Sequence, residues 1–239
     1  MVQRCIYFRY CAGLALGLWL VAWVGCVQGP SEAESPIVAS AFGQALDQVD
    51  TATIDACMVC HSTREMQRGP VLDGLPEWYL ADQLRKFKSG QRGKNAANRA
   101  EALMGVAMAK VETEAQLAAL ARHFAGRKPK PSIRVIRGDA VAGKTLYVIR
   151  CASCHGARGE GKPEIQSPPV NVQEDWFLLD QLRKYANGQR SVHPSDTGGV
   201  MMKGAAANLS LNDLRNTVAY ISKDLTVTPL LQKVGPPKK

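Results

Sequence analysis

The apolar positions of this 239-residue chain follow helical spacing in two segments, 78–87 and 176–185. Apolar residues at i, i+4 and i+7 predict an amphipathic helix with one face against a core. Those faces consist of Leu80, Leu84 and Phe87 in the first segment and Leu178, Leu182 and Tyr185 in the second. The segments also match in sequence, WYLADQLRKF against WFLLDQLRKY, and each is followed by Gly-Gln-Arg. This self-similarity indicates one structural unit used twice.

Other periodic segments predict further helices, at 42–56, 114–125, 141–150 and 212–223. Ser210 or Asn212 is a suitable N-cap for the last of these. Gly90 and Gly188 stand where the repeated helices would end in a left-handed residue. The pattern predicts an all-α chain built from two similar halves.

Two Cys-x-x-Cys-His motifs carry the candidate chemistry, one at 57–61 and one at 151–155. This motif is typical of c-type haem attachment. Two thiols three residues apart each add to a haem vinyl group, and the following histidine is held beneath the iron. The thiols are those of Cys57, Cys60, Cys151 and Cys154, and the histidines are His61 and His155. The sequence therefore predicts two covalently bound haem c groups.

Two other uses of Cys-x-x-Cys fit the spacing less well. A single zinc site made from both pairs usually has its pairs about 15–20 residues apart, and these pairs lie much further apart. A disulfide or a thioredoxin-like dithiol would leave both histidines without a role.

The order of a helix, the haem motif, a proline-bearing loop, an amphipathic helix, a methionine and a closing helix resembles class I cytochromes c. Two such units in tandem, with the repeated tryptophan-led helix, resemble the diheme cytochrome c4 family over about residues 47–225. The resemblance implies two tandem class I cytochrome c domains, each wrapped around one haem. It also implies that His61 and His155 are proximal iron ligands, and that Pro70 and Pro168 orient them through their carbonyl groups.

The resemblance further implies a distal methionine before each closing helix. Aligning the halves on the repeated helix pairs Met104 with Met202, which we prefer. Aligning them on the closing helices pairs Met104 with Met201 instead. Met108, one turn after Met104, is the alternative in the first half, and His193 is an alternative to methionine in the second, because haem iron accepts either residue.

The halves differ in two places. Gly143 and Tyr147 in the first helix of the second half, with Tyr220 in its last, suit a close helix crossing, whereas the first half has Val49 and Thr53 at the matching positions. The second half also has four more residues between its motif histidine and its proline.

We expect a signal peptide or N-terminal membrane anchor at 1–29, a first domain at 40–126, a linker at 127–137, a second domain at 138–226 and a flexible basic tail at 227–239. The leader has Arg4 and Arg9 before an almost wholly apolar stretch, which is typical of export. Lipidation at Cys26 is a third possibility for the leader. The three cysteines outside the haem motifs all lie in or beside this leader. These features predict a periplasmic protein, free or tethered to the inner membrane.

The chain has a formal net charge of +9, which becomes +7 without the two leader arginines. No nucleic-acid motif is present, so an acidic redox partner, such as a terminal oxidase or a dehydrogenase, is the preferred interpretation of the charge. Solubility alone is the alternative.

His/Met ligation fills both axial positions of an iron and leaves no open site. The sequence therefore predicts a single-electron carrier of a respiratory chain and not an enzyme. One alternative is the electron-accepting subunit of a dehydrogenase complex. Another is a catalytic diheme enzyme of the peroxidase or thiosulfate dehydrogenase type.

Overall fold

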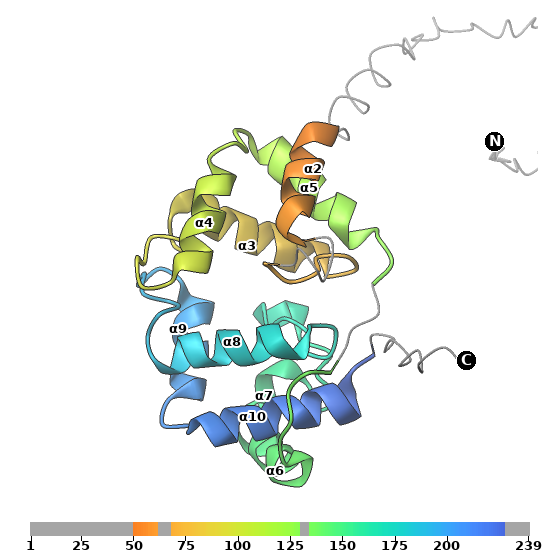
Figure 1. Cartoon of the computed structure of the whole chain (residues 1–239), viewed down its shortest axis with the longest axis vertical. Coiled ribbons are helices and arrows are strands. Elements are labelled where there is room, and N and C mark those ends of the chain that lie inside the picture. The colour runs from red at the N-terminus through yellow and green to blue at the C-terminus, as the bar shows by residue number, and fades with distance from the viewer. Residues whose placement is uncertain (1–49, 62–67, 130–133, 228–239) are drawn as a thin grey trace, which may run out of the picture.

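The computed structural model describes residues 50–61, 68–129 and 134–227. Within these ranges the regular elements are helices, joined by loops, and the only β-pairing is one isolated bridge. The two halves of the chain form two helical bodies that lie one above the other (Figure 1). The predicted all-α class with two similar halves is confirmed.

The described residues of the first half form α2 (Thr51–His61), α3 (Glu77–Ser89), α4 (Arg99–Met108) and α5 (Glu114–Ala125). The second half contains α6 (Ala140–Arg150), α7 (Ala152–His155), a short 3-10 turn (Pro163–Ile165), α8 (Asp175–Ala186), α9 (Thr197–Ala206) and α10 (Leu211–Tyr220), which continues as a π turn (Ile221–Leu225). No helix among these described residues is long and apolar enough to cross a membrane.

The repeated segments form α3 and α8, as the periodicity predicts. Gly90 caps α3 in the left-handed conformation with φ of 80°, and Gly188 adopts φ of 70° just after α8. Ser210, not Asn212, is the N-cap of α10, where its hydroxyl accepts from the backbone N–H of Asp213. The predicted helices 114–125 and 141–150 agree with α5 and, within one residue, with α6.

The sequence interpretation missed α4 and α9 and misplaced one helix end. The first haem motif is helical as far as His61, so α2 does not end at 56; the predicted stretch 42–49 lies outside the described residues. Both missed helices are short and rich in small residues, so neither shows a broad apolar face. Their N-caps, Asn98 and Asp196, were the available signal, since each side chain accepts from a backbone N–H three residues on.

The core of the first half lies between α3 and α5 and includes Leu80, Phe87, Leu117, Leu120 and Phe124. In the second half the buried apolar residues form two clusters, one around Tyr147, Tyr220 and Ile221, the other around Leu179, Leu214 and Val218. Half-buried Leu178 of α8 packs against both clusters. The repeated helix therefore contributes to the core of each half.

Helices α6 and α10 cross at backbone contact. A Cβ on Gly143 would lie 1.9 Å from the carbonyl oxygen of Asn216, so only glycine fits there. Tyr147 and Tyr220 pack beside the crossing with ring centroids 5.6 Å apart. This close approach is the one that the sequence suggests for the second half.

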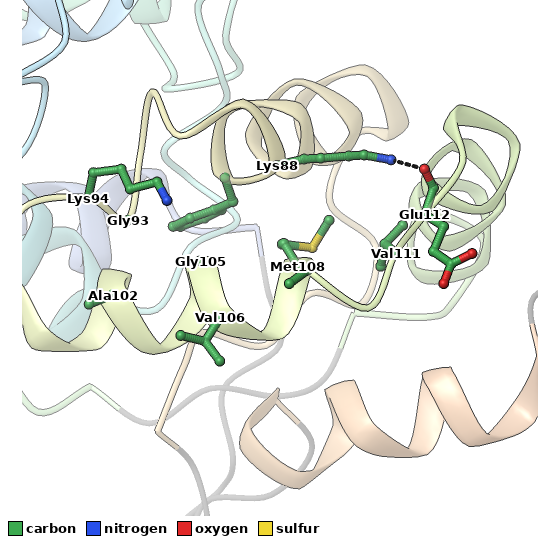
Figure 2. A pocket seen from close by; sticks show the side chains of 11 residues that line it. Lys88, Gly93, Lys94, Ala102, Gly105, Val106, Met108, Val111 and Glu112 are labelled. Carbon is green, nitrogen blue, oxygen red and sulfur yellow. Dashed lines mark hydrogen bonds between the residues drawn. The ribbon is translucent and has the colours of Figure 1, made fainter.

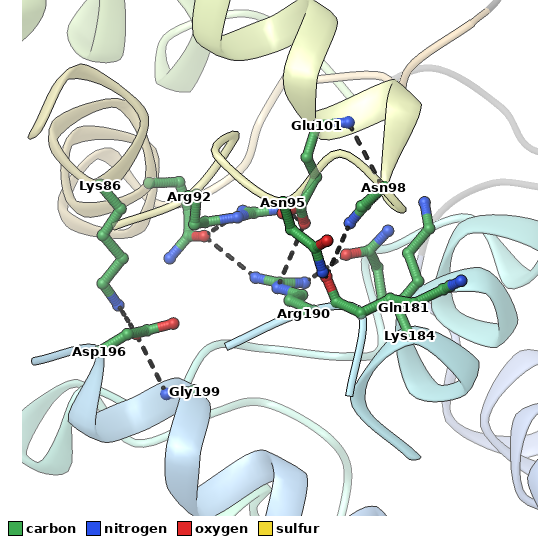
Figure 3. A network of polar contacts seen from close by, with 12 residues as sticks. Lys86, Arg92, Asn95, Asn98, Glu101, Gln181, Lys184, Arg190, Asp196 and Gly199 are labelled. Atoms are coloured by element: carbon green, nitrogen blue, oxygen red, sulfur yellow. Dashed lines mark hydrogen bonds and ion pairs between the residues drawn. The ribbon is translucent and has the colours of Figure 1, made fainter. Parts of the chain in front are cut away.

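The halves also contact one another through a buried polar network (Figure 3). Arg92 and Arg190 are buried, and each guanidinium lies over an aromatic ring of its own half, 4.3 Å from the Phe87 centroid and 4.6 Å from the Tyr185 centroid. Arg190 also donates to the side-chain oxygen of Gln83 in the other half, at 3.1 Å. The arginine that ends each repeat therefore lies at the interface between the halves.

A single carboxylate lies between the two arginines. Glu101 pairs with Arg92 and lies 3.7 Å from Nε of Arg190. A separate ion pair joins Lys86 of the first half to Asp196 of the second, at 3.0 Å. The predicted linker is also held at its ends, because Arg127 pairs with Asp73 and the backbone N–H of Ile136 donates to Asp175.

Candidate haem-binding sites

His61, the last residue of α2, has its ring orientation set by the loop that follows. Its Nδ1 lies 2.6 Å from the carbonyl oxygen of Pro70. A carbonyl oxygen has no proton to give, so Nδ1 carries the proton and Nε2 keeps a lone pair. The ring also packs on Gly69, where a Cβ would come within 2.5 Å of His61 Cε1.

His155, at the end of α7, is held in the same way. Its Nδ1 lies 2.8 Å from the carbonyl oxygen of Pro168 and 3.1 Å from the hydroxyl oxygen of Ser167. Ser167 stands directly before Pro168, as Gly69 stands directly before Pro70. The two imidazoles therefore have different neighbours at this position. The Nε2 of His155 is again left with its lone pair.

Burial lowers the pKa of both histidines below the ordinary value, although the hydrogen bonds to Pro70 and Pro168 act in the opposite direction. Both rings are therefore neutral at pH 7, which is the state in which imidazole binds a metal.

The lone pair of His155 faces a sulfur atom. Met202 Sδ lies 3.4 Å from His155 Nε2. Neither atom carries a proton in this tautomer, so the contact is a pair of lone-pair donors directed at each other and not a hydrogen bond. Imidazole nitrogen and thioether sulfur are two axial donors that haem iron accepts in cytochromes.

The missed helices α4 and α9 determine which methionines are equivalent. Met104 stands six residues after the N-cap Asn98, and Met202 stands six residues after the N-cap Asp196. The alternative alignment arises because the segment between α9 and α10 is one residue shorter than that between α4 and α5. The helical register therefore favours the pairing of Met104 with Met202.

Exposure separates the other candidates. Met201 is 66% exposed, and Leu103, the residue at the same helical position in α4, is 61% exposed. Met108 is 3% exposed and corresponds to Ala206, which is 1% exposed, so that position faces the core in both halves. In the second half the exposed imidazole of His193 contacts the hydroxyl of Ser195, at 2.7 Å.

Met108 also lines a groove of about 660 Å³ between α3 and α4. Figure 2 shows the Met108 side chain among the residues that line this groove, and Phe87 is another of them. Met104, by contrast, is half-buried and packs, like Cys57 and Met58 of α2, against the first core. Met104 and the haem motif of the first half thus border the same core.

The four motif cysteines are half-buried free thiols. Burial raises the pKa of Cys57, and it raises that of Cys151 to about 11, so both are protonated at pH 7. Among the described residues, no group of three or more His, Cys, Asp or Glu side chains is placed to hold a metal ion. The two Cys pairs are therefore not gathered into one zinc site.

The donor set fits a haem in each half: two unpaired thiols, a neutral imidazole with a fixed tautomer and, in the second half, a thioether opposite it. The sequence interpretation missed two neighbours of these sites. One is Ser167 beside His155, and the other is Glu174, whose carboxylate accepts from the backbone N–H of Val71 at 3.0 Å. The signal for Ser167 was its place before the predicted proline, but a contact between halves, such as that of Glu174, leaves no sequence pattern.

Comparison with known proteins agrees with the two-part organisation. The family model described as Cytochrome c matches residues 49–125 and 140–223. A cytochrome c4 of Azotobacter vinelandii is 28% identical over 178 residues, which is 69% of this chain and 82% of the relative. A protein of Thiomonas intermedia (strain K12) named thiosulfate dehydrogenase electron acceptor is 33% identical over 153 residues, 58% of this chain and 66% of that one.

The solved structure of cytochrome c4 from Acidithiobacillus ferrooxidans is similar in fold. It superposes with a TM-score of 0.57 at 25% identity, and the match covers 70% of this chain and 98% of that chain.

Proposed function

Since this chain belongs to the cytochrome c family, we propose that it is a periplasmic diheme electron carrier that passes single electrons between redox partners of a respiratory chain. The observation that carries the proposal is the approach of Met202 Sδ to His155 Nε2. Cytochrome c4 relatives over both halves support it. When bound, each haem supplies an iron that cycles between the ferric and ferrous states.

Different residues attach each haem covalently and bind its iron. Cys57 and Cys60 hold the first haem through thioether bonds, and Cys151 and Cys154 hold the second. His61 and Met104 would bind the first iron, and His155 and Met202 would bind the second. Covalent anchors keep each haem in place, so that electron transfer needs little rearrangement of the protein.

Pro70 and Pro168 keep each imidazole in one tautomer and one orientation. The hydrogen bond from Nδ1 to the proline carbonyl leaves the Nε2 lone pair free to bind a haem iron and would increase its basicity. With a histidine and a methionine bound to each iron, small ligands would be excluded. This arrangement favours electron transfer over catalysis at the haem.

A second candidate function is that of electron acceptor for a dehydrogenase. The relative from Thiomonas intermedia bears the name thiosulfate dehydrogenase electron acceptor, which favours a sulfur-compound dehydrogenase as the donor. In this case the same two haems would receive electrons from one dedicated partner.

The test is to count the haems and follow their redox state. Mass spectrometry of the protein purified from an export-competent host should show two covalent haems, and acid-acetone extraction should leave the colour with the polypeptide. A chain with one haem, with none, or with zinc would contradict the proposal. Mixing the oxidised protein with a thiosulfate dehydrogenase and thiosulfate then separates the two candidates, because only a dedicated acceptor is reduced faster than an unrelated c-type cytochrome.

A further inference from the structure

The carboxylate of Glu174 lies directly behind the histidine of the other half. Glu174 is the N-cap residue of α8 in the second half and is buried, with 9% of its surface exposed. Its Oε2 accepts from the backbone N–H of Val71 at 3.0 Å. Val71 follows Pro70, whose carbonyl oxygen accepts from His61 Nδ1. A short chain of bonds therefore runs from this carboxylate to the first imidazole.

The described residues of the first half make no equivalent contact with the loop behind His155 in the second half. Pro169 occupies the place of Val71 in the second half, and proline has no N–H to donate. Pro76, the N-cap residue of α3, occupies the place of Glu174 and has no charge. His155 has instead the neutral hydroxyl of Ser167 near its Nδ1. A carboxylate thus lies beside the Pro70–Val71 peptide of the first half, and neither Pro76 nor Ser167 places one beside the equivalent peptide of the second.

A negative charge at this position stabilises the more positive form of whatever it faces. For His61, burial is the largest influence and lowers its pKa, while the hydrogen bond to Pro70 and the charge of Glu174 both raise it. The same field favours ferric over ferrous iron, because the ferric site carries one more positive charge. Bulk salt screens such a buried charge only weakly.

We propose that Glu174 is a positioning residue that lowers the reduction potential of the first haem from within the second domain. The inference rests on the proposed binding of a haem at His61. It makes the potential of one half depend on the docking of the other, since Glu174 reaches Val71 only when the halves are in contact.

The experiment is an optical redox titration of the full-length protein carrying Glu174→Gln. Glutamine keeps the size of the side chain and an oxygen that accepts from Val71, and it removes the charge. We expect the reduction equilibrium of the first haem to shift about tenfold toward the ferrous state, which is 59 mV for a one-electron couple. The reduction potential of the second haem should not change. In the titration, the second haem is identified as the one whose potential Met202→Ala lowers.

Two matched variants separate this effect from others. Glu164→Gln removes the same charge from an exposed site in the second half and should leave the first haem unchanged. Lys86→Met breaks the ion pair with Asp196 between the halves and tests whether a weakened interface alone moves the potential.

The inference is overturned if Glu174→Gln changes neither reduction potential, changes both equally, or changes that of the second haem. It is also overturned if Glu164→Gln or Lys86→Met gives the same shift. Mass spectrometry of the same sample distinguishes a failure of the proposed function: fewer than two haems contradict that proposal, whereas two haems with an unchanged reduction potential for the first contradict only the role of Glu174.

Discussion

Met202 Sδ and His155 Nε2 face each other at 3.4 Å although they lie 47 residues apart in the chain. The orientation of each is set separately, Met202 by its position in α9 and His155 by the carbonyl of Pro168. Haem iron accepts both imidazole nitrogen and thioether sulfur, so these two atoms are candidate axial ligands.

Replacing Met202 with alanine should open the second haem without detaching it, because the two thioethers and His155 remain. We expect a lower potential for that haem, since Met/His ligation raises it, and new binding of carbon monoxide to the reduced protein. Carbon monoxide difference spectra check this. Met201→Ala is the matched control, because its side chain is largely exposed and should change neither property. A result in which only Met201→Ala opens the haem would place the ligand one residue earlier.

Gly143→Ala should destabilise the second domain, because the new Cβ would meet the backbone of α10 and not a movable side chain. Forced overpacking of this kind typically costs about 1–3 kcal/mol and occasionally more. Thermal unfolding followed by circular dichroism measures the loss. Gly204→Ala in α9 is the control: nothing lies within 4 Å of its added Cβ, so helix propensity should make it neutral or stabilising by up to about 1 kcal/mol. Equal melting temperatures for the two variants would contradict the close crossing of α6 and α10.

Glu101→Gln should weaken the interface between the halves. It leaves the buried guanidinium groups of Arg92 and Arg190 without their shared carboxylate, and breaking a buried ion pair costs about 3–5 kcal/mol. Limited proteolysis between the domains should become faster, and urea unfolding should begin at a lower concentration. Glu114→Gln removes an exposed pair with Arg85 and should cost less than about 1 kcal/mol. If both variants behave alike, the network does not hold the halves together.

Electron transfer to the physiological partner should slow as salt rises. The chain without its leader arginines has a net charge of +7 by sequence, which attracts an acidic partner, and added salt shortens the reach of this attraction. Second-order rate constants measured by stopped flow at several ionic strengths check the prediction. A rate that stays flat or rises with salt would show that the positive charge does not guide this encounter.

Features that depend on neighbours in the chain could be predicted from the sequence alone. The haem motifs need two thiols and an imidazole on one short stretch, so their letters are sufficient to indicate the chemistry. The apolar faces of α3 and α8 follow from spacing within a few turns, and Gly90 ends its helix because the left-handed conformation suits glycine.

Only the tertiary structure could decide what depends on contacts between distant segments. The choice between Met201 and Met202 depends on the rotation of α9, a helix whose small residues give no clear periodic face. The difference between the two histidine environments depends on Glu174, which lies 103 residues from Val71 in the chain. Arg92 and Arg190 follow the repeated helices in the sequence, which does not show their burial; they are buried where the two halves meet. The spacing along the chain shows which side chains share a helix face. What that face contacts is determined only by how the two halves pack together.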